Sequence, residues 1–349
     1  MKNVKKQPDE FSLVELLQEI QRRTRPENIP ADQQQSIIQM LIHILQAYAT
    51  RMERPLPAQD VQDIRGQTHV KRALEVSAAG QHNILLVGPP GAGKALLART
   101  LPSLLPATAL PHPFREPPSD IARNAFLGDT AIPGELTLAH GGVLFLKDLA
   151  TFDLALLTSL ARTVETRVTS VPLREGHTAL PASFLLVATI KPCPCGFSGD
   201  PARACLCSAE EIARYRQPLK EIVRTCFAIE IEVPLLVPEI LSIYPDESSL
   251  DIRRRVEAAR AIQHKRYAGT AHLQVNADLQ SVDEVQRYCQ IDSAGEQLLA
   301  VALRQLNLSA LQILRLQAVA RTIADLAGSP TIAAKHLAEA LQYLSRFAR

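Results

Sequence analysis

The chain has 349 residues, of which 46% are hydrophobic and 21% charged, and its formal net charge is +2. This length suits one large domain or two to three modules with a buried core. The small net charge does not by itself indicate a nucleic-acid or membrane partner. No apolar run reaches the roughly 18 residues that a membrane span needs, and the polar start is not typical of a signal peptide. We therefore expect a cytoplasmic protein with no membrane partner.

Two amphipathic patterns, at residues 11–23 and 31–52, occupy the start of the chain, and a proline-containing stretch separates them. They predict an N-terminal helical extension over residues 1–55. Its apolar face is expected to pack on its own protein in preference to a partner. Pro55 and Pro57 then indicate a stiff linker before the next segment.

A glycine-rich stretch follows the apolar run at residues 84–87 and precedes an apolar helical pattern. It reads Gly88-Pro89-Pro90-Gly91-Ala92-Gly93-Lys94-Ala95. Strand, glycine loop and helix in this order are typical of a phosphate-binding loop, whose backbone N–H groups cradle phosphates while Lys94 contacts the outer ones. The last position of this motif normally supplies a Ser or Thr hydroxyl to Mg²⁺, and Ala95 has none. Nucleotide binding and catalysis are therefore separate questions here.

Strand and helix patterns alternate from residue 56 to residue 236, which predicts a core with a parallel α/β sheet. The candidate strands are residues 83–87, 143–146, 184–188 and 229–233. A helix at 153–164 and a hairpin lie between the second and third strands. The hairpin arms are residues 167–173 and 179–184, around the turn Glu175-Gly176-His177, where glycine supplies the backbone freedom of a tight turn.

Helical patterns alone fill residues 237–349, which predicts a C-terminal all-helical module. The expected helices are residues 250–268, 280–289, 293–308, 309–327 and 331–348. Gly328 suits the exit of the fourth helix, and Thr331 suits the start of the fifth.

Four of the six cysteines crowd into fifteen residues, as Cys193-Pro194-Cys195 and Cys205-Leu206-Cys207. In a cytoplasmic chain, such crowding indicates metal binding before disulfides. Four thiolates suit a tetrahedral Zn²⁺ ion in a structural site, because four protein ligands leave no open position. The alternative is a group of four reduced structural cysteines.

A basic run lies on the predicted helix at residues 250–268. Its members are Arg253, Arg254, Arg255, Arg260, His264, Lys265 and Arg266. Such a run can contact nucleic-acid phosphates or the acidic surface of a neighbouring subunit. A solvated helix face is the more frequent explanation. Arg167 and Arg174 of the hairpin are further candidate phosphate contacts.

The order of P-loop, α/β sheet and helical module is the layout of AAA+ ATPases. The chain more closely resembles their magnesium-chelatase-like branch, which includes the chelatase I subunit and the helicase ComM. The stretches that carry the resemblance are DIRGQTHVKRALEVSAAGQHNILLVGPPGAGKALLARTLPSLLP, HPFREP, PGELTLAHGGVLFL, PCPCGFSGDPARACLC, ARTIADLAG and HLAEALQY. The Lon-like N-terminal domain typical of ComM is not expected, because a short helical segment stands in its place.

This resemblance implies an AAA+ core with a C-terminal helical lid, and ATP or ADP as the cofactor. The nucleotide-binding residues that it implies are Ile64, the glycines and prolines from Gly88 to Gly93 with Ala92, Lys94 and Ala95. It also implies a ring made of the chain itself or of paralogous AAA+ subunits. The hairpin matches an insertion that points to the ring pore in this family.

Six positions depart from the family's catalytic pattern. The residues that stand there are Ala95 for the magnesium hydroxyl, Lys147 and Asp148 for the Asp-Glu pair, Lys191 for the sensor-1 Asn, Cys226 for the arginine finger and Leu311 for the sensor-2 Arg. A lysine cannot ligate a cation, and an Asp is one methylene too short to activate the water efficiently. Arg224 and Arg315 lie nearby in sequence but do not occupy the matching positions.

These substitutions predict a catalytically impaired protein that retains nucleotide binding and serves as a structural or regulatory ring subunit. An arginine finger alone contributes about 10³ to 10⁵ to the rate of P-loop enzymes. Asp with Mg²⁺ and Lys147 each carry a local charge of +1, so nucleotide is expected to bind without magnesium. The rival is an empty pocket in which Lys147 pairs with Asp148 or another carboxylate.

Two other functions stay open. The first is an active ATP-hydrolysing motor that uses substitute residues and acts on DNA or on a chelatase complex. The second is a nucleic-acid-binding module that does not use nucleotide. The six substitutions argue against the motor, and the retained Lys94 argues against the second alternative.

Overall fold

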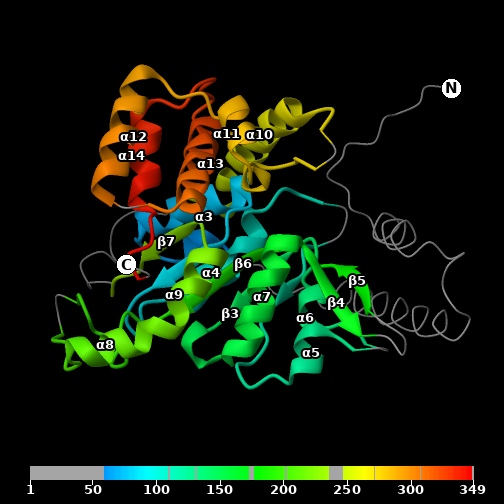
Figure 1. The fold of residues 1–349 in the computed structure, drawn as a ribbon, viewed down its shortest axis with the longest axis vertical. Coiled ribbons are helices and arrows are strands. Elements are labelled where there is room, and N and C mark those ends of the chain that lie inside the picture. Colours follow the sequence, from blue (N-terminus) through cyan, green and yellow to red (C-terminus); the bar gives the residue numbers. More distant parts are fainter. Residues whose placement is uncertain are drawn as a thin grey trace, which may run out of the picture. The chain divides into compact units, whose positions relative to one another are not determined.

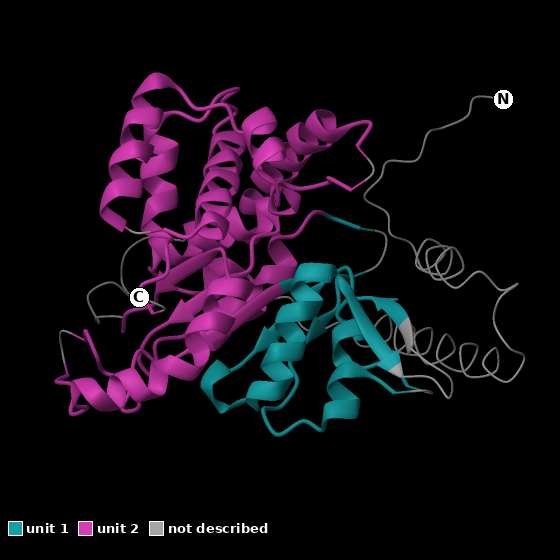
Figure 2. Cartoon of the chain, viewed as in Figure 1, with its two compact units in different colours: residues 1–58, 107–185 teal, residues 59–106, 186–349 magenta. Residues whose placement is uncertain are grey.

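The computed structural model describes residues 59–108, 111–129, 132–172, 177–200, 203–235, 247–270, 272–306 and 308–347. They fall into two compact units (Figure 2): unit 1 contains residues 107–185, and unit 2 contains 59–106 and 186–349. The predicted N-terminal extension, the hairpin residues Arg174, Glu175 and Gly176, and both predicted domain boundaries lie outside the described residues. The division into residues 1–55, 56–236 and 237–349 therefore stays a prediction.

Five parallel strands form one sheet in the order β2-β3-β6-β1-β7 (Figure 1). Their bounds are β1 (Ile84–Val87), β2 (Phe114–Arg115), β3 (Val143–Leu146), β6 (Leu185–Ile190) and β7 (Ile229–Glu232). All residues of β1, β3 and β6 are buried, which is why these strands read as nearly continuous apolar runs and do not alternate with polar residues. The predicted parallel α/β sheet is confirmed.

Unit 2 places β1 at the centre of its strands, with β6 on one side and β7 on the other. Four helices of this unit adjoin the strands in sequence: α3 (Thr68–Gly80), α4 (Lys94–Leu104), α8 (Ala209–Arg216) and α9 (Lys220–Cys226). The Asn83 side chain fixes the start of β1, because its Nδ2 donates to Cys226 O at 2.9 Å and its Oδ1 accepts from Leu186 N at 2.9 Å. The strand that leads into the glycine loop is therefore held at both flanks.

The predicted C-terminal helical region is confirmed, and Figure 1 shows its helices grouped together. They are α10 (Ser249–Tyr267), α11 (Val282–Tyr288), α12 (Ser293–Leu306), α13 (Ala310–Leu326) and α14 (Ala334–Gln342). Ser248, Ser281 and Ser309 each accept a backbone N–H from the first turn of the helix that follows, as N-cap residues do. None of the helices in the described residues is long and apolar enough to cross a bilayer.

A buried ion cluster holds the helical region together around Asp325, whose side chain is fully buried. This carboxylate accepts from both terminal nitrogens of Arg266, from Arg321 Nε at 3.1 Å and from Asn276 Nδ2 at 2.9 Å. Arg321 is itself only 1% exposed and also donates to Pro330 O at 2.8 Å. Each charge in this cluster therefore has a partner of opposite sign and further hydrogen bonds.

The basic run of α10 is mostly engaged within its own protein, which corrects the expectation of a solvated helix face. Four of its arginines bind internal acceptors: Arg253 binds Ser103 O, Arg255 binds Glu75 and Glu247, Arg260 binds Ala78 O, and Arg266 binds Asp325. The physical reason is that α10 packs on α3 and α4, whose carboxylate and terminal carbonyl oxygens need donors. Arg254 alone of the three consecutive arginines is exposed, and it pairs with Asp251 on the same helix.

Unit 1 contains the predicted hairpin, formed by β4 (Val168–Pro172) and β5 (His177–Pro181) in antiparallel pairing. Its helices are α5 (Arg123–Leu127), α6 (Glu135–Leu138) and α7 (Leu154–Thr166). Asp153 caps α7 by accepting from Ala155 N at 2.8 Å, and Arg167 ends it with a left-handed φ of 58°. Arg167 thus serves as the turn between helix and hairpin arm.

Candidate nucleotide-binding site and cysteine cluster

The loop between β1 and α4 has the backbone of a phosphate-binding loop. Gly91 and Gly93 have φ values of 85° and 81°, in the left-handed region where glycine is favoured. Gly88 approaches the neighbouring strand so closely that an added methyl group would lie 2.2 Å from Val233 O. Its N–H donates to Ile190 O at 3.1 Å. Glycine is therefore favoured at all three positions, at Gly91 and Gly93 because of their backbone conformation and at Gly88 because a side chain would not fit.

Lys94 begins α4, with its ammonium group turned back onto the loop. Its Nζ donates to Gly88 O at 2.7 Å and to Pro89 O at 2.6 Å. The first N–H groups of a helix lack intrahelical acceptors, so the start of α4 offers donors beside this positive charge. The lysine, the helix start and the glycine backbone together have the chemistry to hold a phosphate group, and phosphate binding stays a prediction.

Gln67 ties the stretch that contains Ile64 to the glycine loop. Its Nε2 donates to Ala92 O and to Pro234 O, both at 3.0 Å. The residue is only 7% exposed, and its Oε1 has no hydrogen-bond partner among the described residues. Lys71 fixes the same stretch by donating to Ile64 O. A buried acceptor left over beside the loop suits a ligand with an N–H donor.

The six substituted positions are distributed over both units. In unit 2, Ala95 is the second residue of α4, Lys191 directly follows β6, Cys226 ends α9, and Leu311 lies in the first turn of α13. In unit 1, Lys147 directly follows β3, and Asp148 adopts a left-handed φ of 60° at the start of the short 3-10 helix Leu149–Thr151.

Neither the residue at the finger position nor the nearby Arg315 is available as an arginine finger. Cys226 is 1% exposed, and its carbonyl accepts from Asn83. Arg315 donates from Nη1 to Arg224 O at 2.6 Å and to Phe227 O at 3.4 Å, and from Nη2 to Thr225 O. This guanidinium group caps the carboxyl end of α9, which is a structural role.

The four clustered cysteines lie on one loop between β6 and α8, and their sulfur atoms all fall within 4.8 Å of one another. Cys193 Sγ lies 3.4 Å from Cys195 Sγ and 3.6 Å from Cys205 Sγ, and Cys195 Sγ lies 3.6 Å from Cys205 Sγ. None of them forms a disulfide. A tetrahedral Zn²⁺ site with Zn–S distances of about 2.3 Å requires sulfur separations of about 3.8 Å. The donor set fits this ion.

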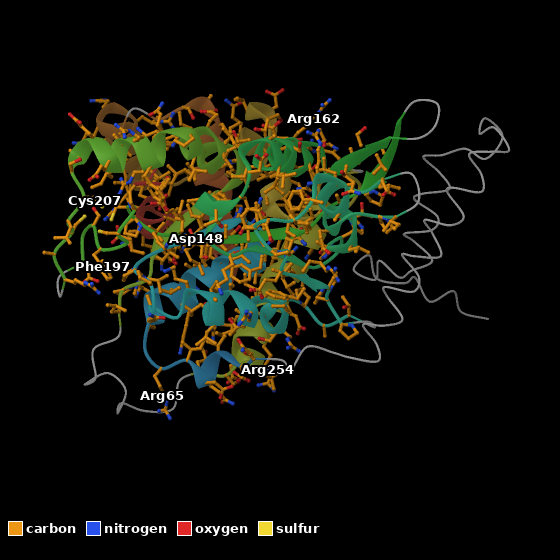
Figure 3. The ribbon with its side chains drawn as sticks, turned by 90° about the horizontal axis from the view of Figure 1, so that it is seen from below. Arg65, Asp148, Arg162, Phe197, Cys207 and Arg254 are labelled. Atoms are coloured by element: carbon orange, nitrogen blue, oxygen red, sulfur yellow. The ribbon has the colours of Figure 1, made fainter. Side chains whose placement is uncertain are left out.

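Backbone N–H groups point at these sulfur atoms, as they do around metal-bound thiolates. Gly196 N and Ser198 N donate to Cys193 Sγ at 3.2 and 3.3 Å. The N–H groups of Phe197 and Leu206 lower the pKa of Cys195 to about 6. Figure 3 shows Phe197 and Cys207 together at the edge of the molecule. The sulfur environments differ, because burial and hydrogen bonds from the neighbouring thiols raise the pKa values of Cys205 and Cys207.

Three residues that sequence reasoning missed hold the base of this loop. Tyr215 of α8 donates to Lys191 O at 3.2 Å, and Arg216 donates to Pro192 O at 2.8 Å. The ring of Phe347 packs edge-on against Tyr215, with centroids 6.2 Å apart, and lies under the Arg216 guanidinium. These contacts join segments that are far apart in the chain, so no local sequence pattern predicts the three residues.

The parallel sheet, the glycine-rich loop after β1 and the C-terminal helical region are together those of the AAA+ class. A family model described as magnesium chelatase, subunit ChlI, matches residues 60–111 and 108–240. A second model, described as the C-terminal part of that subunit, matches residues 246–344. The chain belongs to the magnesium chelatase-like family that includes ComM.

Curated relatives agree with this assignment. The chain is 37% identical to the uncharacterized protein YifB of Escherichia coli over 328 residues, which cover 84% of this chain and 63% of that protein. It is 38% identical to the competence protein ComM of Haemophilus influenzae over 312 residues, which cover 81% and 60%. An uncharacterized protein of Mycobacterium tuberculosis is 32% identical, with 84% and 63% covered. The chain thus spans about three fifths of the length of these relatives.

Proposed function

We propose that this chain is a catalytically impaired AAA+ protein that binds ATP or ADP and acts as a structural or regulatory subunit of a ring. The ring is formed with further copies of the chain or with paralogous AAA+ subunits, in the cytoplasm. One observation carries the proposal: the loop keeps the glycine geometry and Lys94 of a phosphate-binding site, while Ala95 offers no metal ligand. Binding and hydrolysis are thereby separated.

The replaced side chains lack the chemistry of hydrolysis. Ala95 has no oxygen for Mg²⁺, and the Lys147 ammonium repels a cation in place of ligating it. General base catalysis contributes about 10² to 10⁴ to a rate, and Asp148 is one methylene shorter than the family's Glu. These residues act as a unit on the same transition state, so loss of one already removes much of the rate and the separate losses do not simply multiply.

The family's finger position and the nearby Arg315 supply no arginine finger to a neighbouring subunit. With Cys226 buried and Arg315 bound to the end of α9, neither residue reaches into the nucleotide site of an adjacent ring member. An arginine finger is worth about 10³ to 10⁵ in rate. A subunit of this kind still alters its neighbour, because nucleotide at an interface between subunits couples the two sites.

DNA stays a proposed partner, and α10 is a poor candidate for its contact surface. Phosphate binding requires Lys or Arg side chains that face solvent, whereas four arginines of α10 bind their own protein. A DNA-binding module without nucleotide use predicts salt-sensitive binding that ATP does not change. A chain that binds DNA in this way and binds no ATP would contradict the proposed function.

We expect ATP to bind this chain equally well in EDTA and in Mg²⁺, because the Lys147 charge replaces that of Asp with the metal. Equilibrium dialysis with labelled ATP in the two buffers measures this. The matched variant Lys147→Asp is expected to bind ATP about tenfold more weakly in EDTA than in Mg²⁺. If the unchanged chain binds ATP only in the presence of Mg²⁺, the proposal that Lys147 takes the place of the metal ion is wrong.

A further inference from the structure

The cysteine loop contacts the phosphate-binding loop directly through Gly196. Gly196 has a φ of 89°, and a methyl group added there would lie 2.8 Å from Pro90 Cδ and 3.7 Å from Lys191 Cδ. The same residue donates its N–H to Cys193 Sγ at 3.2 Å and to Cys193 O at 3.0 Å. One glycine therefore joins a candidate metal ligand, the glycine loop and the sensor-1 position.

The β6 end of the cysteine loop is fixed independently of its sulfur atoms. At the β6 end, Ile190 O accepts the N–H of Gly88, which is the first glycine of the phosphate-binding loop. At the same end, Tyr215 and Arg216 of α8 donate to the carbonyls of Lys191 and Pro192, the first two residues after β6. The described residues from Cys193 to Cys207 lie outside any helix or strand, so cross-linking of the four thiols would restrain the rest of the loop.

The sulfur geometry favours a metal over the other states of four thiols. The sulfur separations of 3.4 and 3.6 Å are far from the roughly 2.05 Å of a disulfide and close to the roughly 3.8 Å edge of a zinc tetrathiolate. Two backbone N–H groups already donate to Cys193 Sγ, which satisfies a thiolate better than a neutral thiol.

We propose that Cys193, Cys195, Cys205 and Cys207 bind one Zn²⁺ ion and that this ion braces the phosphate-binding loop through Gly196 and Pro90. Each thiol that becomes a ligand releases its proton to solvent, and no electron is transferred. Four protein ligands close the coordination sphere, so the ion is structural. The metal site stands on its own, whereas its effect on ATP binding rests on the proposed nucleotide binding.

Metal content tests the first half of this proposal. After dialysis against metal-free buffer, the purified full chain is expected to retain one zinc ion per chain. Elemental analysis by inductively coupled plasma mass spectrometry measures this. Cobalt substitution is expected to give the visible absorption bands of a tetrahedral cobalt thiolate. The variants Cys205→Ser and Cys207→Ser are expected to lose the ion, while Cys289→Ala, a buried cysteine of the helical region, keeps it. A chain without retained zinc and without cobalt bands would overturn the site.

Two glycines of the same loop form a matched pair for the second half. Gly196 and Gly199 have similar φ values of 89° and 82°, yet a methyl group at Gly199 would meet nothing within 4 Å. Backbone strain is therefore common to both alanine variants, and contact with Pro90 is not. Gly196→Ala is expected to weaken ATP binding about tenfold relative to Gly199→Ala. Equal ATP affinities of the two variants would contradict the brace.

Hydrogen exchange measures the effect of zinc on the phosphate-binding loop without using ATP. It therefore tests the brace separately from the proposed nucleotide binding. Removal of zinc by a chelator is expected to speed amide exchange in residues 88–93, without ATP present. Amides of residues 318–325 in the buried helix α13 serve as the internal reference, because they lie away from the loop in sequence and in hydrogen bonding. Faster exchange in a chain that binds no ATP would support the brace and refute the nucleotide function. Unchanged exchange in a chain that holds zinc would refute the brace.

Discussion

The variant Asp325→Ala is expected to lose about 3 to 5 kcal/mol of its free energy of unfolding, because it leaves two buried guanidinium groups without a counter-charge. Arg321 is 1% exposed, and the Arg266 side chain is 17% exposed, so neither reaches bulk water easily. Asn276 Nδ2 loses an acceptor at the same time. Urea unfolding followed by circular dichroism measures the change.

An exposed ion pair of α10, also in the helical region, provides the control. Asp251 pairs with Arg254 at 3.2 Å, with side chains 49% and 68% exposed. Exposed pairs contribute about 0 to 1 kcal/mol, so Asp251→Ala is expected to cost far less than Asp325→Ala. Equal losses in the two variants would show that burial of the Asp325 cluster does not determine its contribution.

Lys94→Ala is expected to weaken ATP binding by about 30- to 1,000-fold, which corresponds to about 2 to 4 kcal/mol. The ammonium group is the charge that faces the loop backbone, at 2.6 and 2.7 Å from two of its carbonyls, and a charge-assisted bond to phosphate contributes more than a neutral one. Fluorescent-nucleotide titration or calorimetry measures the affinity.

Lys220→Ala is the matched control for this variant, because Lys220 carries the same charge at the start of another helix of unit 2, α9. It is expected to bind ATP as the unchanged chain does. An unchanged affinity in Lys94→Ala would mean that nucleotide, if bound, does not use the glycine loop.

The strands and the helical region were predictable because their local patterns survive in the fold. The buried strands β1, β3 and β6 are mainly apolar runs, with glycines next to β1 and β3, and the helices α10, α11 and α13 have serine N-caps. The two-residue strand β2 escaped prediction, because a segment so short carries no periodicity.

The backbone of the glycine loop and the clustering of the four cysteines could also be predicted from the sequence, since both depend on spacing within a short stretch of chain. The basic run of α10 was not, because the acceptors for Arg253, Arg255 and Arg260 come from α3 and α4, about 150 to 180 residues away. Gln67 was missed for a similar reason, since its two acceptors, Ala92 O and Pro234 O, lie in distant segments. The spacing of basic residues along a helix predicts that they share one face of that helix. Only the packing of the folded chain determines whether that face contacts solvent or another segment of the protein.

Phosphate release at saturating ATP and Mg²⁺, measured beside ATP binding on one preparation of the chain, tests the central claim most directly. We predict that the chain binds ATP and releases phosphate no faster than the Lys94→Ala variant does. The reason is that Ala95, Lys147 and Lys191 leave no site for metal binding and water activation. Release that is well above this background and disappears in Lys94→Ala would contradict it. The chain would then be an active motor, with a metal ligand and an arginine finger at positions other than those of the family.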